Sequence, residues 1–263
     1  MGYHLTLEKA NDVFKQWSEE NVIYAPKRFV GGGAFSDTDV IRYGEVQKVE
    51  EIELNEKSDF SFKEILIPLS ETLFFFTEDE VKEADSPKKG AIVLLRSCDL
   101  HSVKRLDEIY LHNGPEDYYY KRLRDKVKFV LIGCESAFDS CFCVDMGTNE
   151  SKDYDASLER KGDTVCIDNK NNDWEDLLSA NSSCIEEVVP AHVTETMTRV
   201  SIPENITLDI FNSTMWDEYD SRCINCGRCN FSCPTCTCFT MQDIFYTDNG
   251  KVGERRRVQA SCM

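Results

Sequence analysis

The segments AIVLL at residues 91–95 and VKFVLI at residues 127–132 decide the fold, because both are short and almost wholly apolar. Strands that are buried on both faces of a sheet have this composition. Between them, apolar residues recur at helical spacing, namely Leu100, Val103, Leu106 and Ile109. Asp99 is expected to cap this helix. A strand, a helix and a strand in this order predict a parallel pair joined by a right-handed crossover.

Weaker patterns surround this unit. An amphipathic helix is expected from Met1 to about Glu20, a further strand near residues 164–167 and a short helix near residues 174–178. Together these elements predict an α/β or α+β domain over residues 1–215. Residues 216–263 are expected to form a second unit, a mainly helical ferredoxin-type module.

Composition narrows the class of protein. The 263 residues carry a formal net charge of -18, with acidic residues spread along the chain, so a nucleic-acid partner is not expected. An anionic membrane surface is disfavoured for the same reason, and no apolar run is as long as a membrane span. The first residues lack the basic flank and apolar core of a signal peptide. Thirteen cysteines in a reducing, cytoplasmic setting therefore indicate metal binding rather than disulfides.

The strongest motif is Cys223-x-x-Cys226-x-x-Cys229-x-x-x-Cys233-Pro234, which has the bacterial ferredoxin spacing. Three thiolates on one tight loop can each reach a different iron of a cubane, and Gly227 lets the backbone wrap closely. Structural zinc is the lesser alternative, because it uses paired C-x-x-C knuckles separated by a longer insert. The motif predicts at least one 4Fe–4S cluster.

The role of Cys233 stays open at this point. In two-cluster ferredoxins the fourth cysteine of such a run binds the other cluster, but the sequence holds no second run of this spacing. The module is therefore expected to be truncated at its C-terminal end. Cys236 and Cys238 are expected to pack beside the cluster. The run at residues 254–257, Glu-Arg-Arg-Arg, is interpreted as a solvated helix face, with partner docking or charge compensation as alternatives.

A second set of thiols is expected at the edge of the parallel strands. Cys98 and Cys134 follow the two buried strands, and Cys141 and Cys143 lie on the loop that leaves the second strand. Ligands bind beyond the carboxyl ends of parallel strands. These four cysteines are therefore candidates for an additional iron–sulfur cluster, with a zinc site or inert buried thiols as alternatives. Cys166 and Cys184 are isolated and are interpreted as structural.

These motifs resemble a known family. Residues 222–238, with Gly-Glu-Arg-Arg-Arg at 253–257 and Ser261-Cys262, closely resemble the iron–sulfur electron-transfer subunit of anaerobic sulfite reductase. The segments at residues 96–101, 133–134 and 141–148 are similar both to that sulfite reductase component and to β subunits of cytoplasmic NiFe hydrogenases. The resemblance extends over most of the chain from about Ala25.

The resemblance implies a non-catalytic electron carrier of a cytoplasmic, anaerobic oxidoreductase complex. Such a carrier would take electrons from a flavin-bearing reductase subunit and pass them to a sirohaem catalytic subunit that reduces sulfite. The equivalent subunit of a NiFe hydrogenase is the alternative, and a cluster-based sensor or scaffold is an alternative of another class. The sequence shows no catalytic triad, acid–base pair or phosphate-binding loop, so no catalytic residue is assigned.

The ligand assignment in the ferredoxin run predicts a specific loss. Cys226→Ser should lose the absorbance of the cluster at this run and lower the soluble yield together, because metal binding is coupled to folding. Cys184→Ser is the control and should keep both. Analysis of iron and acid-labile sulfide makes the measurement, and a full complement in Cys226→Ser would show that the assignment is wrong.

Overall fold

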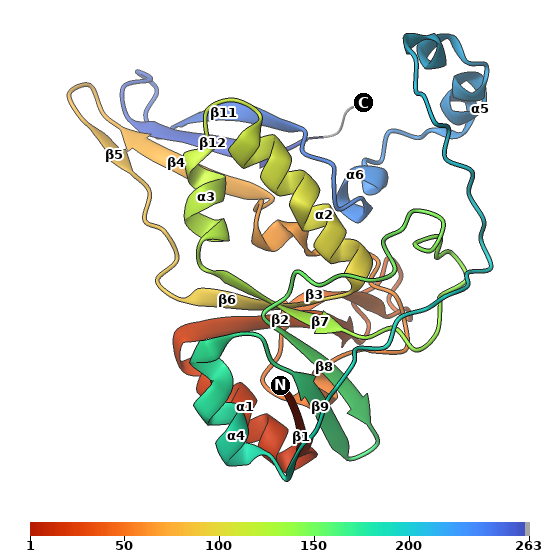
Figure 1. Cartoon of the computed structure of the whole chain (residues 1–263). Helices are drawn as coiled ribbons and strands as arrows, with labels where there is room; N and C mark the ends of the chain where they lie inside the picture. The colour runs from red at the N-terminus through yellow and green to blue at the C-terminus, as the bar shows by residue number, and fades with distance from the viewer. Residues whose placement is uncertain (261–263) are drawn as a thin grey trace.

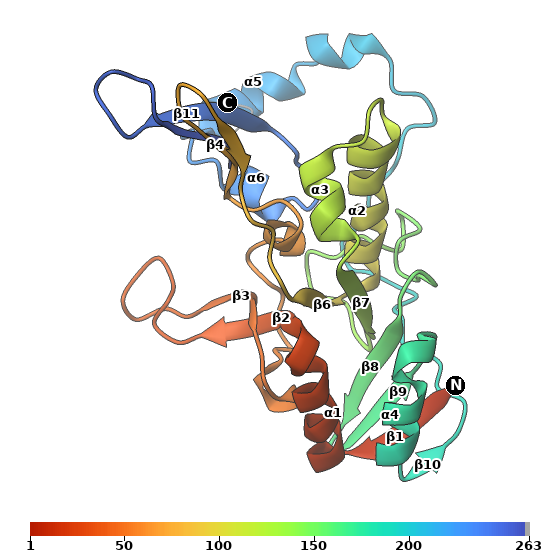
Figure 2. The ribbon, with the colours of Figure 1, turned by 90° about the vertical axis from the view of Figure 1, so that its left-hand side faces the viewer.

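The computed structural model describes residues 1–260 and has two sheets with helices on both sides of the larger one (Figure 1). The larger sheet has eight strands in the order β10-β1-β9-β8-β7-β6-β2-β3, and the smaller has four in the order β11-β12-β4-β5. Figure 2 shows the smaller sheet at the opposite end of the molecule from α1 and α4. The mixed α/β class expected from the sequence is confirmed.

The two segments that decide the fold form adjacent strands inside the larger sheet. Strand β6 (Gly90–Leu95) pairs in parallel with β7 (Val127–Ile132), and β2 (Asn21–Phe29) and β8 (Ala156–Lys161) extend the parallel part on either side. Successive residues of β6 contribute to different cores: Ile92 and Leu94 to one, Val93 and Leu95 to the other. This alternation follows from the strand period of two and explains why both segments are almost wholly apolar, with Lys128 as the exception.

Helices fill both faces of this sheet. Helices α1 (Leu7–Glu20) and α4 (Glu175–Asn181) pack on one face, where the ring of Trp17 lies 4.5 Å from that of Trp174, the N-cap of α4. Helices α2 (Ser97–Asp107) and α3 (Tyr118–Arg124) pack on the other face, joined by the π-helical turn Glu108–His112. Within residues 1–260, none of the helices combines the length and the apolar composition needed to cross a membrane.

Two local expectations were wrong. The first helix begins at Leu7, because Gly2–Thr6 forms strand β1, which pairs with β9 (Thr164–Asp168) and β10 (Cys184–Ile185). Helix α2 begins at Ser97 with Arg96 as its N-cap, so Asp99 lies in the first turn and does not cap the helix. A carboxylate in a first turn still interacts favourably with the helix dipole.

The C-terminal part is not mainly helical. It has the short helices α5 (Met215–Arg222) and α6 (Arg228–Ser232), and it also contains the hairpin of β11 (Phe239–Phe245) and β12 (Gly253–Gln259). The sequence feature that could have indicated this hairpin is Asn249-Gly250, a residue pair that favours tight turns. Gly250 has a φ of 70°.

The hairpin joins distant parts of the chain. Strand β12 pairs with β4 (Ser70–Phe76), which pairs in turn with β5 (Val81–Glu83). Two strands of the first predicted unit and two of the second thus share one sheet. The division at residue 215 stays a prediction.

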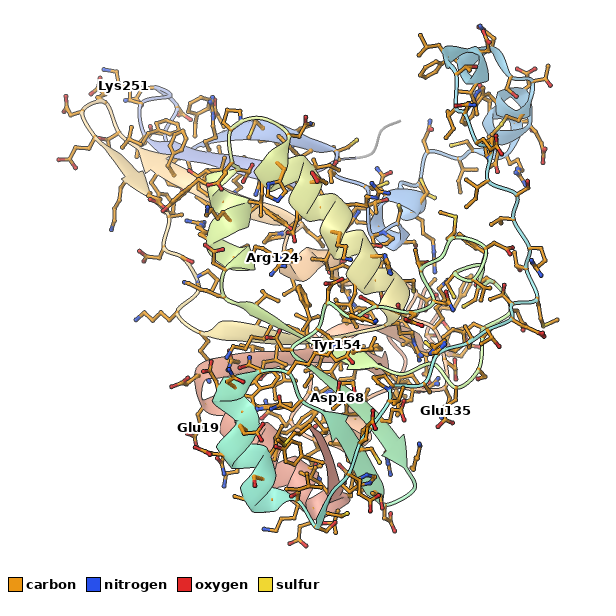
Figure 3. The ribbon with its side chains drawn as sticks, in the orientation of Figure 1. Glu19, Arg124, Glu135, Tyr154, Asp168 and Lys251 are labelled. Atoms are coloured by element: carbon orange, nitrogen blue, oxygen red, sulfur yellow. The ribbon has the colours of Figure 1, made fainter. Side chains whose placement is uncertain are left out.

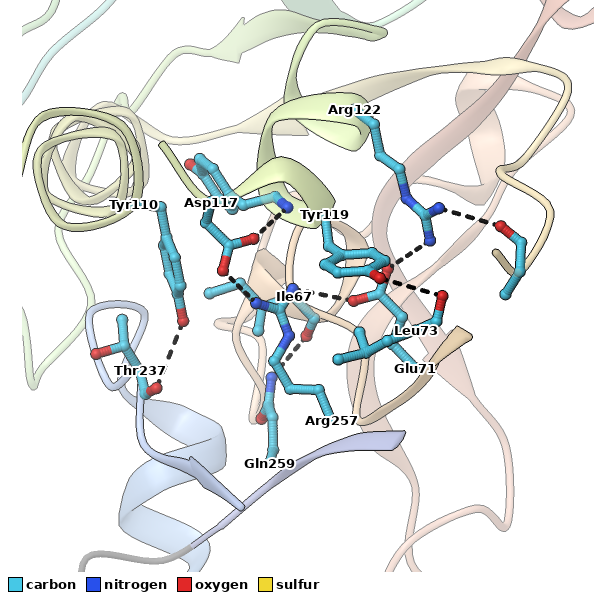
Figure 4. Close-up of polar contacts among 12 residues, drawn as sticks. Ile67, Glu71, Leu73, Tyr110, Asp117, Tyr119, Arg122, Thr237, Arg257 and Gln259 are labelled. Carbon is cyan, nitrogen blue, oxygen red and sulfur yellow. Dashed lines mark hydrogen bonds and ion pairs between the residues drawn. The ribbon is translucent and has the colours of Figure 1, made fainter. Parts of the chain in front are cut away.

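The arginine run lies on β12 and not on a helix, which corrects the solvated-helix interpretation. Arg255 pairs with Asp243 across the hairpin, 2.7 Å away, whereas Arg257 points inward and is 2% exposed. Its guanidinium donates to Asp117 (2.7 Å) and Glu71 (2.9 Å), as Figure 4 shows. Arg122 donates to the other oxygen of Glu71 at 3.0 Å. One buried cation therefore connects β12, β4 and the start of α3.

This ion network predicts a large, position-specific loss of stability. Arg257→Ala would take the guanidinium away from Asp117 and leave Glu71 with Arg122 alone, and breaking a buried pair costs about 3–5 kcal/mol. Arg255→Ala removes an exposed pair on the same strand and should cost about 0–1 kcal/mol. Anaerobic urea unfolding of both variants makes the comparison. Equal losses in the two variants would contradict the importance assigned to the buried position.

Candidate iron–sulfur sites

The backbone of the ferredoxin run forms a tight loop between two helices. Cys223 is the C-cap of α5, Cys229 lies within α6, and Cys233 is the C-cap of α6. Asn225 and Gly227 both have left-handed backbones, with φ of 54° and 69°. These two residues turn the chain back on itself between Cys223 and Cys229, which is the role expected for Gly227.

The thiols of this run differ in their surroundings. Cys223, Cys226 and Cys229 are exposed, and Cys233 is partly buried. Burial works to raise the pKa of Cys233, but hydrogen bonds from Thr235 and Cys236 outweigh it and lower the pKa overall. The hydroxyl of Thr235 lies 3.3 Å from the sulfur. A lowered pKa favours the thiolate, which is the form that binds metal.

The candidate second set lies where the parallel strands end. Cys98 is in the first turn of α2, just beyond β6, and Cys134 follows β7, so the expected common edge is confirmed. Burial raises the pKa of the Cys98 thiol, and so do Asp99, Cys134, Cys143 and Cys141 in that order. The last three effects show that this edge brings the four cysteines into electrostatic range of one another.

Arg96 is a residue of this edge to which the sequence analysis gave no role. Its guanidinium donates to the sulfur of Cys134 at 3.2 Å and to the carbonyl of Leu54 at 2.8 Å. The same group lies 4.8 Å from the centre of the Phe138 ring. Hydrogen bonds to ligand sulfurs tune the potential of iron–sulfur clusters, so a cluster held by Cys134 would be influenced by Arg96.

A cavity of about 650 Å³ adjoins this edge. It is bounded by Cys134, Ser97 and the extended segment at residues 185–192. Tyr154 and Asp168, labelled in Figure 3, are at its wall, and the tyrosine hydroxyl donates to Asp168 at 2.9 Å.

Of the remaining cysteines within residues 1–260, two lie near the ferredoxin run and two lie in strands outside both sets. Cys236 and Cys238 lie beside Cys233, near the start of β11, whereas Cys166 is buried in β9 and Cys184 is exposed in β10. Across residues 1–260, no three side chains of His, Cys, Asp or Glu are already gathered as a metal-binding group. The assignment of individual ligands therefore stays a prediction for both sets.

Comparison with known proteins identifies the chemistry of the C-terminal part. Residues 222–263 match the model of a 4Fe–4S dicluster domain. The chain is also 27% identical over 248 residues to sulfhydrogenase 2 subunit beta of Pyrococcus furiosus, a match that spans 88% of this chain and 71% of that protein. No solved structure matches the chain.

The protein thus carries a ferredoxin-type domain at its C-terminal end and binds 4Fe–4S clusters. It is an iron–sulfur protein related to a hydrogenase β subunit. The donor set fits this cofactor, because four thiolates on a tightly turned loop match the soft-ligand preference of iron in clusters. The part of the family resemblance carried by Ser261-Cys262 lies outside the described residues.

The second cysteine set is tested in the full-length chain, because truncation before Cys223 would also remove β12. We expect a variant with Ser at positions 223, 226, 229 and 233 to retain iron and sulfide when purified without oxygen. Adding Cys134→Ser should remove them, whereas adding Cys184→Ser should not. If the variant with the four Ser substitutions contains zinc and no iron, the second site is a structural zinc site. If that variant folds without any metal, the second site is refuted.

Proposed function

We propose that the protein is a non-catalytic electron-transfer subunit of a cytoplasmic oxidoreductase complex of the hydrogenase type. The observation that carries the proposal is the similarity to the sulfhydrogenase β subunit, which extends over 88% of the chain. When bound, 4Fe–4S clusters supply one-electron transfer. Cys223, Cys226, Cys229 and Cys233 hold one cluster, and Cys98, Cys134, Cys141 and Cys143 hold another.

The surroundings of the ferredoxin run support a role in transfer to a partner. Three of its thiols are exposed, so a cluster there lies close to the surface. Helix α5, directly before Cys223, stands away from the body of the molecule (Figure 1) and exposes Met215, Trp216 and Tyr219. Exposed apolar side chains that lie together mark interaction sites. A partner protein seated on α5 would lie next to the cluster.

The electron-transfer subunit of an anaerobic sulfite reductase is the second candidate. It is favoured by the motif at residues 222–238 and the Gly-Glu-Arg-Arg-Arg segment at 253–257, which resemble that protein. In both candidates a flavin-bearing subunit supplies electrons. The two differ in the acceptor, which contains nickel in the first and sirohaem in the second.

Purification of the native complex under anaerobic conditions tests the proposal. We expect two further subunits, one with flavin and one with nickel, to accompany the chain, and the flavoprotein to reduce its cluster in stopped-flow measurements. Cys226→Ser, which removes this cluster, should lose the corresponding phase of that reduction. Sirohaem absorbance without nickel would favour the second candidate. A cluster that stays oxidised beside the reduced partner would indicate a sensor or scaffold.

A further inference from the structure

We propose that Lys63 is a positioning residue for the ferredoxin-run cluster, holding its loop and raising its reduction potential through its positive charge. The inference deepens the proposed function and rests on it, because it takes Cys233 as a ligand of that cluster. Lys63 lies in the 3₁₀ helix Phe62–Ile65, far from the cysteine run in sequence.

The burial of Lys63 requires an explanation. It is 1% exposed, although lysine is among the residues least often fully buried. A buried ammonium is costly unless it is paired or hydrogen-bonded. Lys63 therefore has a structural or functional reason to lie inside the protein.

Its hydrogen bonds lead to the cluster loop. The ammonium nitrogen donates to the carbonyl oxygen of Asn230, within α6, and to that of Cys236 at 2.9 Å. These two acceptors lie on either side of Cys233. The side chain thus fixes the backbone on both sides of the fourth cysteine of the run.

The neighbours of Lys63 bind the same loop. The amide of Ser61 donates to the carbonyl of Phe231 at 3.0 Å, and Asp59 accepts from Arg228 and Ser232, both at 3.1 Å. Residues 59–63 therefore form one continuous contact with α6. Lys63 is the part of this contact that reaches the interior.

The charge of Lys63 acts on the sulfurs. Burial lowers the pKa of Lys63, whereas Cys236, Cys233, Glu64 and Cys238 act to raise it, so three thiols are within electrostatic range of the ammonium. Reduction adds one electron, and hence one negative charge, to a cluster. A fixed cation in a region of low dielectric stabilises the reduced state more than the oxidised state. The potential is therefore higher than it would be with a neutral side chain.

The test uses EPR to measure the reduction potential of the ferredoxin-run cluster in the full-length chain. The EPR signal of this cluster is identified as the one that Cys226→Ser removes. At the midpoint potential of the unmodified protein, we expect Lys63→Met to lower the ratio of reduced to oxidised cluster at least about tenfold, which is 59 mV for one electron. Lys63→Gln, which keeps a donor but no charge, should behave similarly. In Lys63→Arg the ratio of reduced to oxidised cluster should stay within about threefold of that of the unmodified protein. The same is expected of the exposed control Lys121→Met.

Several outcomes decide the question. If Lys63→Met fails to fold, Lys63→Gln supplies the neutral variant. Loss of the cluster from Lys63→Gln, with the cluster kept in Lys121→Met, supports the positioning role. A complete cluster with an unchanged ratio in Lys63→Gln overturns the proposal, as does an equal shift in Lys63→Arg. Failure of the proposed function would look different, since the partner flavoprotein would then not reduce the cluster of the unmodified protein.

Discussion

The buried guanidinium of Arg257 is the interaction on which the arrangement of the two sheets depends. It contacts Glu71 on β4 and Asp117 at the start of α3, while its own strand pairs with β4. A cation in this position is stable only with carboxylates at the right distance, so the burial of Arg257 requires all three segments to be in place. The loop that carries Cys223 to Cys233 lies between α5 and β11. Its C-terminal end continues into β11, which pairs with β12, the strand that carries Arg257.

Two buried cations therefore join opposite halves of the chain. Arg257 belongs to the C-terminal hairpin and reaches into the N-terminal part, whereas Lys63 belongs to the N-terminal part and reaches the carbonyls beside Cys233. In a protein with a net charge of -18, such inward-facing cations are set against a mostly acidic surface. The charge of Lys63 lies near the thiols of this loop, whereas the charge of Arg257 is matched by Glu71 and Asp117.

The sequence revealed the elements whose pattern is local. Residues 91–95 and 127–132 were recognisable as central strands because both of their faces are buried, and the positions of Cys98 and Cys134 follow from that. It did not reveal that β12 pairs with β4, because such a pairing depends on partners far apart in the chain. Lys63 was missed for the same reason, since nothing in its neighbourhood distinguishes a buried lysine from a solvated one.

The pairing of β4 with β12 also has a consequence for biosynthesis. Glu71 and Arg257 are 186 residues apart, so at about 5–20 residues per second the ribosome needs roughly 10–40 s to supply the partner of β4. During that interval the strand, with the segment Leu-Phe-Phe-Phe at 73–76, has no neighbour on the side that β12 will occupy. An apolar unpaired edge of this kind invites aggregation. Newly made chains would therefore benefit from a chaperone until the hairpin emerges.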